Sequence, residues 1–262
     1  MISPDCALPY TRRSDLTIYA RKSSLSGLAA ALILSLASLS TYAEQTDGLP
    51  TLTPFHAEYV IKLAGISVGK LVRRLKFSSD VDYSFSSEST GTGIASLFQN
   101  NSTRENTYGK YLESGIEPEQ YIRERKKGKN VKSEKIDFKY SKNIAIKHRK
   151  GAEKIVPLDR PSFDPLSYQL QIMLDLTTQQ STFSYTIHSA KKVKTYHAST
   201  DLIETVTTPF AELPSVKISE QADNGNKTTF WCAEALGYLP VKVEIEKDGK
   251  STVILLKKYT RH

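Results

Sequence analysis

The chain of 262 residues carries 36 Lys and Arg against 28 Asp and Glu, so its net charge is +8; 39% of its residues are hydrophobic and two are cysteines. This composition excludes a wholly disordered chain, a collagen and a small disulfide-stapled protein. No apolar stretch is long enough to suggest a polytopic membrane protein. We therefore expect a mildly basic globular protein.

An export signal is predicted at the N-terminus. Arg21 and Lys22 precede an apolar run over residues 25–39, which is short for a membrane-spanning helix and typical of a signal-peptide core. Thr41 and Ala43 suit cleavage after Ala43, so residues 1–43 are expected to be a signal peptide, over-long because of a start codon placed too early. A retained membrane anchor is the alternative. No cysteine directly follows the run, so we expect a periplasmic protein that is not a lipoprotein.

Removal of residues 1–43 changes the totals. The mature chain of 219 residues has 32 basic and 26 acidic side chains, a net charge of +6, and Cys232 is its single cysteine. An internal disulfide is then excluded, and stability must come from the core. Residues 44–53 are expected to be a flexible lead-in, and residues 54–262 a single β-rich domain without a dividing linker.

Alternating apolar and polar residues predict a succession of strands. Phe55, Tyr59 and Leu63 share one face of the first strand, and Gly65 and Gly69 mark a turn or bulge after it. The dipeptides Asn224-Gly225 and Asp248-Gly249 suit hairpin turns with positive φ. One helical turn is expected at residues 94–98. Further strands are predicted at residues 71–77, 81–85, 103–112, 119–127, 131–140, 144–148, 183–189, 192–197, 202–208, 216–222, 228–232, 241–246 and 252–259.

One helix is predicted, at about residues 164–176. Asp164 is a suitable N-cap, Pro165 suits the first helical position, and Leu166, Leu170 and Leu174 recur at helical spacing. Many antiparallel strands with one central helix favour a mainly β fold, either a curved sheet or an open barrel. Tyrosine and phenylalanine at strand positions would line its interior, either around an apolar cavity for a lipid-like ligand or in a filled core.

The most basic segment runs over residues 123–154, with thirteen basic residues against four acidic ones. It is a candidate surface for lipid head groups or acidic polymers. The alternative is a pair of hairpins whose solvated lysines prevent aggregation between sheet edges. The candidate anion-facing patch comprises Arg123, Arg125, Lys126, Lys127, Lys129 and Lys132.

Catalytic and metal-binding motifs are not found in the sequence. The five histidines lack the spacing of a zinc site, although His188 and His197 could approach each other across a hairpin around Lys191. Ser167 lacks a nucleophile-elbow motif, and Cys232 lies in an apolar strand where a buried, inert thiol is common. We assign no catalytic, cofactor or metal residues, and we interpret Asp164 and Pro165 as a structural helix cap.

Three sequence blocks occur together in a fixed order. They are Phe55-x-Ala57-x-Tyr59 with Gly65-Ile66-x-Val68-Gly69; Phe163-Asp164-Pro165-Leu166-Ser167; and Phe230-Trp231 followed by Gly237-Tyr238-Leu239-Pro240-Val241 and Asp248-Gly249. In order and spacing they resemble the bacterial domain-of-unknown-function family 3108 over most of residues 54–260. The resemblance implies a Gram-negative periplasmic setting and a mostly antiparallel β fold, and it implies no reaction. The curved sheet is also reminiscent of lipoprotein carriers, by fold analogy alone.

The leading hypothesis is a non-enzymatic periplasmic protein that binds a lipid-like or anionic component of the cell envelope. A structural or protein-interaction module of the envelope with a filled core is the alternative, and a hydrolase of unknown substrate is the second alternative. No cofactor, no nucleic acid and no transmembrane span after signal cleavage are expected, and the oligomeric state is left open.

Overall fold

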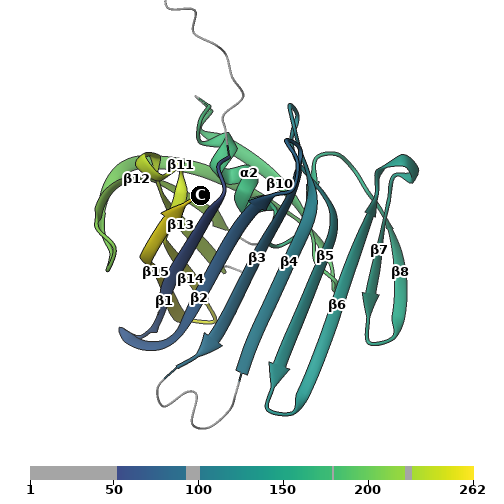
Figure 1. Ribbon diagram of the computed structural model, residues 1–262, viewed down its shortest axis with the longest axis horizontal. Helices are drawn as coiled ribbons and strands as arrows, with labels where there is room; N and C mark the ends of the chain where they lie inside the picture. Colours follow the sequence, from purple (N-terminus) through teal and green to yellow (C-terminus); the bar gives the residue numbers. More distant parts are fainter. Residues whose placement is uncertain (1–51, 93–100, 179, 222–225) are drawn as a thin grey trace, which may run out of the picture. The chain divides into compact units, whose positions relative to one another are not determined.

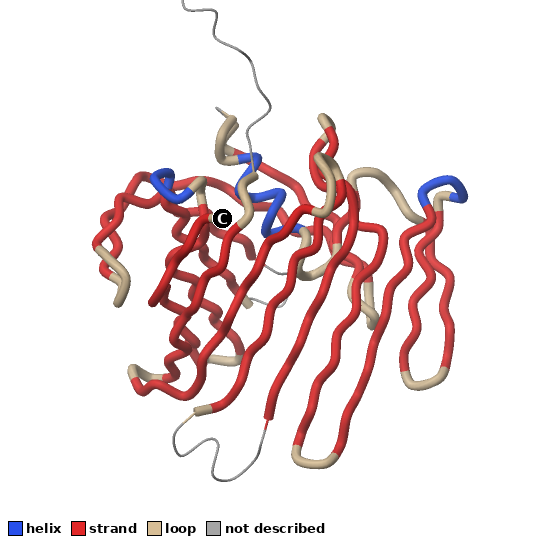
Figure 2. The backbone as a smooth tube through the Cα atoms, in the orientation of Figure 1, coloured by secondary structure: helices blue, strands red, loops and turns tan. Residues whose placement is uncertain are grey.

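The structure, a computed structural model, describes residues 52–92, 101–178, 180–221 and 226–262. Strands dominate these ranges and helical segments are short (Figure 1, Figure 2). Within the same ranges, no helix has the length and apolar character needed to cross a membrane. The first eight strands are β1 (Phe55–Leu63), β2 (Ile66–Phe77), β3 (Asp82–Gly91), β4 (Asn101–Leu112), β5 (Gly115–Lys127), β6 (Asn130–Lys139), β7 (Ile144–Arg149) and β8 (Ala152–Pro157).

The second half of the described chain contains one α-helix and seven strands. The 3-10 helices η1 (Tyr140–Lys142) and η2 (Glu234–Leu236) each lie between two strands. The elements are β9 (Ser162–Phe163), α2 (Tyr168–Asp175), β10 (Thr182–His188), β11 (Val193–Thr207), β12 (Glu212–Gln221), β13 (Lys227–Ala233), β14 (Leu239–Lys247) and β15 (Lys250–Arg261).

The fifteen strands of the described ranges form one sheet, in the order β8-β7-β6-β5-β4-β3-β2-β1-β15-β14-β13-β12-β11-β10-β9. Neighbours are antiparallel except β9 and β10, which are parallel. The sheet is curved (Figure 1). Strands β8 and β9 are its two edges and are not paired with each other, so the sheet is open and does not close into a barrel. The expected mainly β fold with one central helix is confirmed.

The sheet curls until strands far apart in its order come side by side. Phe138 of β6 lies edge-on to His188 of β10, with ring centroids 5.8 Å apart. Strands β5 and β9 are also in contact. The concave face of the first half is therefore covered in part by the β9–β10 edge, although no backbone pairing joins the two.

Helix α2 packs into the concave side and is shorter than expected. It spans Tyr168–Asp175, whereas the sequence predicts about 164–176, because the residues after Asp164 first form a separate turn. Gln171 Oε1 accepts a hydrogen bond from Ile116 N of β5 at 2.9 Å. The Tyr185 hydroxyl of β10 donates to Asp175 at 2.8 Å. These bonds tie the helix to both sides of the curled sheet.

A continuous core fills the space between helix and sheet. Leu170 and Ile172 of α2 are buried together with inward side chains of the strands, including Phe55, Leu75 and Phe230. The ring of Tyr168 packs edge-on against Phe230, with centroids 6.2 Å apart. The aromatic residues that the sequence places inside the sheet thus pack against α2 rather than around a hollow.

Hairpin turns explain the strand pairing. Three two-residue hairpin turns have positive φ at both residues: Ala64-Gly65, Lys150-Gly151 and Asp248-Gly249. Gly237-Tyr238, which follows η2, is a further described pair with positive φ. The geometry of the hairpin turns matches the twist of paired strands, and glycine adopts it without steric cost. The sequence predicts the last of the three hairpin turns; its other expected turn, Asn224-Gly225, lies outside the described residues, as do residues 1–43 and 94–98.

Some strand boundaries differ from the sequence prediction. Residues 192–197 and 202–208, predicted as separate strands, belong to the single strand β11, whose pairing with β12 shifts between Thr200 and Ile203. The bulge expected near Gly69 is present as a register shift of β1 on β2 between Ile61 and Lys62. The edge strands β8 and β9 are not predicted by alternation.

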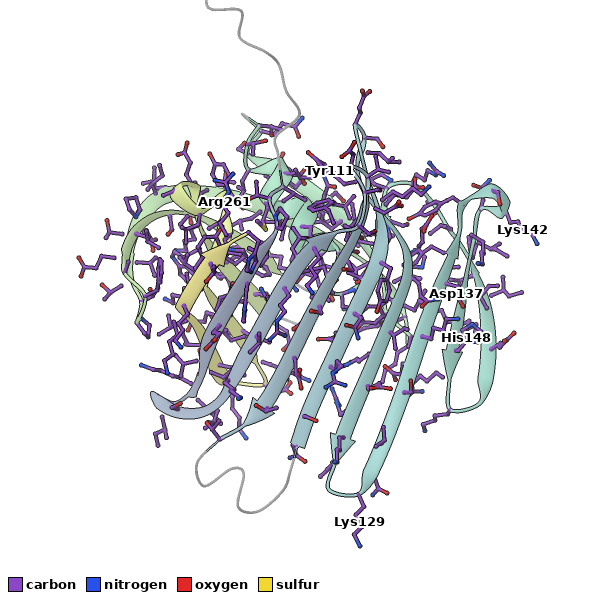
Figure 3. All side chains as sticks on the ribbon, in the orientation of Figure 1. Tyr111, Lys129, Asp137, Lys142, His148 and Arg261 are labelled. Carbon is purple, nitrogen blue, oxygen red and sulfur yellow. The ribbon has the colours of Figure 1, made fainter. Side chains whose placement is uncertain are left out.

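Because neighbouring strands are antiparallel, the connections between them lie at two opposite ends of the sheet. The turns β1–β2, β5–β6, β7–β8, β10–β11 and β14–β15 lie at one end, here called the turn end. The connections β2–β3, β4–β5, β6–β7, β11–β12 and β13–β14 lie at the opposite end. In Figure 3, Lys129 marks the turn end and Lys142 the opposite end.

Candidate functional site

A pocket of about 330 Å³ lies at the turn end of the concave face. Strands β10–β14, the β10–β11 turn and the residues that begin α2 contribute to it. Its lining residues are Pro165, Tyr168, Ile187, Ser189, Lys192, Lys194, Tyr196, Glu220, Asn226, Lys227, Thr228, Ile245, Glu246 and Lys247. This volume lies at the lower end of the range for small-molecule sites.

The lining combines two kinds of surface. Tyr168, Ile187 and Ile245 supply apolar area. The four lysines Lys192, Lys194, Lys227 and Lys247 converge on the pocket from three hairpins, with Glu246 as an acidic neighbour. We call this site the lysine-rimmed pocket. Its charge favours an anionic group, and its apolar surface favours a hydrocarbon chain.

Glu220 of β12 is the buried acid of the pocket. It is 6% exposed, and its Oε2 atom has no hydrogen-bond partner among the residues that the structure describes. Burial raises the pKa of this carboxyl to about 7, and hydrogen bonds from Thr228 and Tyr168 offset the rise only in part. A buried polar atom without a partner is costly, so Oε2 is an available position for a polar group of a ligand.

No local sequence signal reveals this pocket. Glu220 and Thr228 are opposite each other in the β12–β13 register, while Tyr168 comes from the helix. Their convergence depends on strand pairing and on the docking of α2. The cluster of Lys191, Lys192 and Lys194 in the sequence is the one feature that could have pointed to it.

The structure places the predicted anion-facing patch on the β5–β6 hairpin but divides it between two faces. Arg125 and Lys127 lie on the face of β5 that also carries buried Tyr121, and Lys126 lies on the other face. Lys129 lies in the turn. Arg125, Lys126 and Lys127 border a second pocket of about 400 Å³, whose other lining residues are Ile61, Val68, Gly69, Ser89, Thr90, Gly91, Asn101, Ser102 and Thr103.

Arg123 has a different role from the rest of the patch. It lies between Glu105 of β4 and Glu134 of β6 in the same row of the sheet, at 3.6 and 4.0 Å. Glu134 also pairs with Arg149 of β7 at 2.8 Å. Four adjacent strands thus carry a ladder of alternating charges, in which Arg123 is neutralised locally. The alternation is visible only once the strand register is known.

Asp164 anchors the start of the helical segment. Its Oδ1 accepts hydrogen bonds from the backbone N–H groups of Leu166 and Ser167 at 2.8 and 2.9 Å. Its Oδ2 accepts a bond from the Thr107 hydroxyl of β4 at 2.7 Å. Burial raises the pKa of Asp164 to about 6, and these hydrogen bonds limit the rise. Pro165 follows in the turn and also lines the lysine-rimmed pocket.

The two nucleophile candidates are enclosed. Ser167 is buried, and its Oγ accepts a hydrogen bond from Asp164 N at 3.0 Å. Cys232 is fully buried in β13, and burial raises the pKa of its thiol. A raised thiol pKa disfavours the reactive thiolate.

His188 and His197 do not lie close together, although the sequence suggested that they could meet across the β10–β11 hairpin. His188 is opposite Val193 in the β10–β11 register, while His197 is opposite Ser184. His188 is buried and contacts the Ser162 hydroxyl at 3.2 Å, whereas His197 is exposed. The predicted approach of the two histidines is therefore wrong, because their positions are offset by four residues along the paired strands. No group of three metal-ligating side chains is found in the described part of the chain.

A solved structure from another family shares the fold at low sequence identity. A β-barrel-like protein of the domain of unknown function DUF1849 from Brucella abortus is 13% identical, with a TM-score of 0.56; the match covers 80% of this chain and 98% of that one. A hypothetical protein from Chlamydia trachomatis is 9% identical, with a TM-score of 0.33; the match covers 80% of this chain and 88% of that one. No curated protein matches the sequence.

A family match covers most of the chain. Residues 58–255 match the family described as "Protein of unknown function (DUF3108)". This range includes strands β2–β14, parts of β1 and β15, the helix and all the residues that line the lysine-rimmed pocket. The chain belongs to the DUF3108 family, as its three sequence blocks predict.

Proposed function

We propose that this protein is a non-enzymatic, periplasmic component of the Gram-negative envelope that binds an anionic amphiphile in the lysine-rimmed pocket. The observation that carries the proposal is the convergence of four lysines with apolar side chains at the open end of a packed sheet. The predicted signal peptide supports the location. The enclosed positions of Ser167 and Cys232 support a binding role over a hydrolase.

Each part of the pocket has a task in this proposal. The ammonium groups of Lys194 and Lys227 hold the anionic group of the ligand, because charge-assisted hydrogen bonds are among the strongest in proteins. Ile187 and Ile245 contact its hydrocarbon chain. The predicted patch on the β5–β6 hairpin lies at the same end and supplies a second positive surface.

Calorimetric titration with octyl phosphate tests the proposal, with octanol as the uncharged control. Octyl phosphate should bind and octanol should bind much more weakly. The double variant Lys194→Glu, Lys227→Glu should weaken octyl phosphate binding by at least about tenfold, since it removes two charged contacts. The matched variant Lys139→Glu, Lys142→Glu changes the same charge at the opposite end and should retain binding. Equal affinity for phosphate and alcohol, or an equal loss in both variants, would contradict the proposal.

The location has its own test. Protein expressed in a Gram-negative host and recovered from the periplasm should begin at Glu44 after processing. A chain that keeps residues 25–39 and sediments with the membrane would instead support the anchor.

A structural or protein-interaction module is the second candidate. Strand β8 is an unpaired edge of the sheet, and its Ile155 is 63% exposed. An exposed edge offers backbone groups to a partner strand. Replacement of Ile155 by proline should abolish capture of an envelope protein by cross-linking, and should leave octyl phosphate binding unchanged.

A further inference from the structure

The turn end of the sheet is strongly basic. Exposed lysines occupy every described turn region there except β1–β2: Lys129 in β5–β6, Lys150 in β7–β8, Lys191 in β10–β11 and Lys250 in β14–β15. The lysine-rimmed pocket opens among these turns. Glu246 beside the β14–β15 turn, Asp248 in that turn and Glu153 beside the β7–β8 turn are acidic residues at this end. Positive charge therefore surrounds the pocket on a broad surface and is not confined to its lining.

The same end also exposes large apolar side chains. Ile66 follows the β1–β2 turn and is 70% exposed, and Val131 follows the β5–β6 turn and is 62% exposed. Val193 directly follows the β10–β11 turn and is also exposed. Exposed apolar side chains surrounded by lysines are typical of surfaces that bind at the interface of an anionic membrane.

The opposite end has a different character. Asp80 lies in the β2–β3 turn, Glu113 in the β4–β5 turn and Glu234 in η2 between β13 and β14. Lys139 precedes η1 and Lys142 is its last residue, at the same end. Three connections at this end therefore carry an acidic residue and one carries two lysines, whereas four turns at the turn end carry an exposed lysine. This uneven distribution of charge would orient the chain in the field of a charged surface.

We propose that the turn end docks on an anionic lipid bilayer. The lysines of the hairpin turns contact the phosphate head groups, while Ile66 and Val131 enter the boundary between head groups and acyl chains. The pocket then faces the membrane, so that an amphiphile can pass between the two without crossing open water. This inference deepens the proposed function, but docking does not require the pocket to be occupied.

Co-sedimentation with vesicles tests the docking. Wild-type protein should bind vesicles of phosphatidylglycerol and phosphatidylcholine, and binding should fall steeply with salt and be absent on phosphatidylcholine alone. The triple variant Lys129→Glu, Lys191→Glu, Lys250→Glu should lower the partition coefficient by about a hundredfold or more. The matched variant Lys139→Glu, Lys142→Glu, Lys257→Glu should lower it by less than about fivefold. Equal losses in both variants, or salt-independent binding, would overturn the proposal.

Apolar insertion is tested separately. Ile66→Ser with Val131→Ser should weaken vesicle binding by about tenfold or more, because burial of each side chain is lost. Ile203→Ser, at an exposed position of β11 away from the turn end, is the control and should bind as wild type does. If the control loses as much vesicle binding as the double variant does, Ile66 and Val131 have no specific role, and docking through these side chains is wrong.

Docking and pocket binding fail independently in these experiments. Lys129, Lys191 and Lys250 do not line the lysine-rimmed pocket, so the triple variant should keep its affinity for octyl phosphate within about threefold at moderate salt. Vesicle binding without octyl phosphate binding would support the docking surface and refute the pocket. Octyl phosphate binding without vesicle binding would refute the docking surface alone.

Discussion

Asp164 illustrates how one buried side chain can do more than its sequence context suggests. The run Asp-Pro-Leu-Ser indicates a helix cap, and Asp164 does accept the N–H groups of Leu166 and Ser167. It also accepts the hydroxyl of Thr107, 57 residues earlier in the chain. The carboxyl therefore joins the start of the helical segment to β4. This second bond depends on the curl of the sheet, so no local pattern could have shown it.

Glu220 makes a specific pH dependence testable at the residue scale. Its pKa is raised by burial from 4.5 to about 7, so between these values the unfolded chain ionises it while the folded protein keeps it protonated. The free energy of unfolding should therefore fall as pH rises from about 4.5 to 7, by about 2–3 kcal/mol from this group, and then level off.

Denaturant unfolding of Glu220→Gln between pH 4.5 and 8 checks this dependence. The difference in unfolding free energy between the variant and wild type should shift in favour of the variant by that amount as pH rises. Glu113→Gln, at an exposed position of the β4–β5 turn, should show a constant difference. A constant difference for Glu220→Gln as well would mean that the carboxyl ionises as it does in water.

At the scale of elements, Gly109 sets the pairing of β4 with β5. The register shifts between Tyr108 and Gly109, and a Cβ atom at Gly109 would overlap the Glu117 carbonyl oxygen and the Pro118 Cα of the facing strand. Those are backbone atoms, which cannot rotate away. The close approach of the two strands thus requires glycine at this position.

Gly109→Ala should therefore destabilise the protein by about 2 kcal/mol or more, because the strands must separate to admit the methyl group. Chemical denaturation followed by circular dichroism measures the loss. Gly65→Asn is the matched control, since its positive φ suits asparagine and its surroundings are open. A loss of less than about 0.5 kcal/mol for Gly109→Ala would show that the bulge adapts.

Elements with strong alternation could be predicted from the sequence, and those without it could not. The alternating residues of β1 and β14 indicate their strands plainly, because one face is buried and the other is solvated. Strand β8 has exposed or half-buried side chains on both faces, and β9 has only two residues, so neither carries a period. The basic patch on the β5–β6 hairpin can be recognised from the local excess of lysine and arginine, whereas the lysine-rimmed pocket combines residues from five strands and a helix.

For the whole molecule, the curl of the sheet is the feature that most needs explanation. Backbone hydrogen bonds hold successive strands together, but side chains alone hold β10 against β6. His188 lies at this contact, buried between Phe138 and the Ser162 hydroxyl. Burial, together with the positive charge of buried Lys147, lowers the pKa of His188 from 6.5 to about 4, while the charge of Asp159 acts in the opposite direction.

Acid should therefore loosen the curl. Between pH 6.5 and about 4 the unfolded chain binds a proton at His188 that the folded protein resists, so the free energy of unfolding falls as pH falls, by about 2–3 kcal/mol from this group. The free energy of unfolding therefore changes with pH in the opposite direction to the change expected from Glu220. His188→Gln should remove this part of the acid sensitivity, and His197→Gln, on the exposed face of β11, should keep it.

Hydrogen exchange at pH 5 shows which strands are affected. If the curl depends on neutral His188, the amides of β9 and β10 in the wild type lose protection before those of β1 and β15 do. A uniform loss of protection across the sheet would place the acid sensitivity elsewhere.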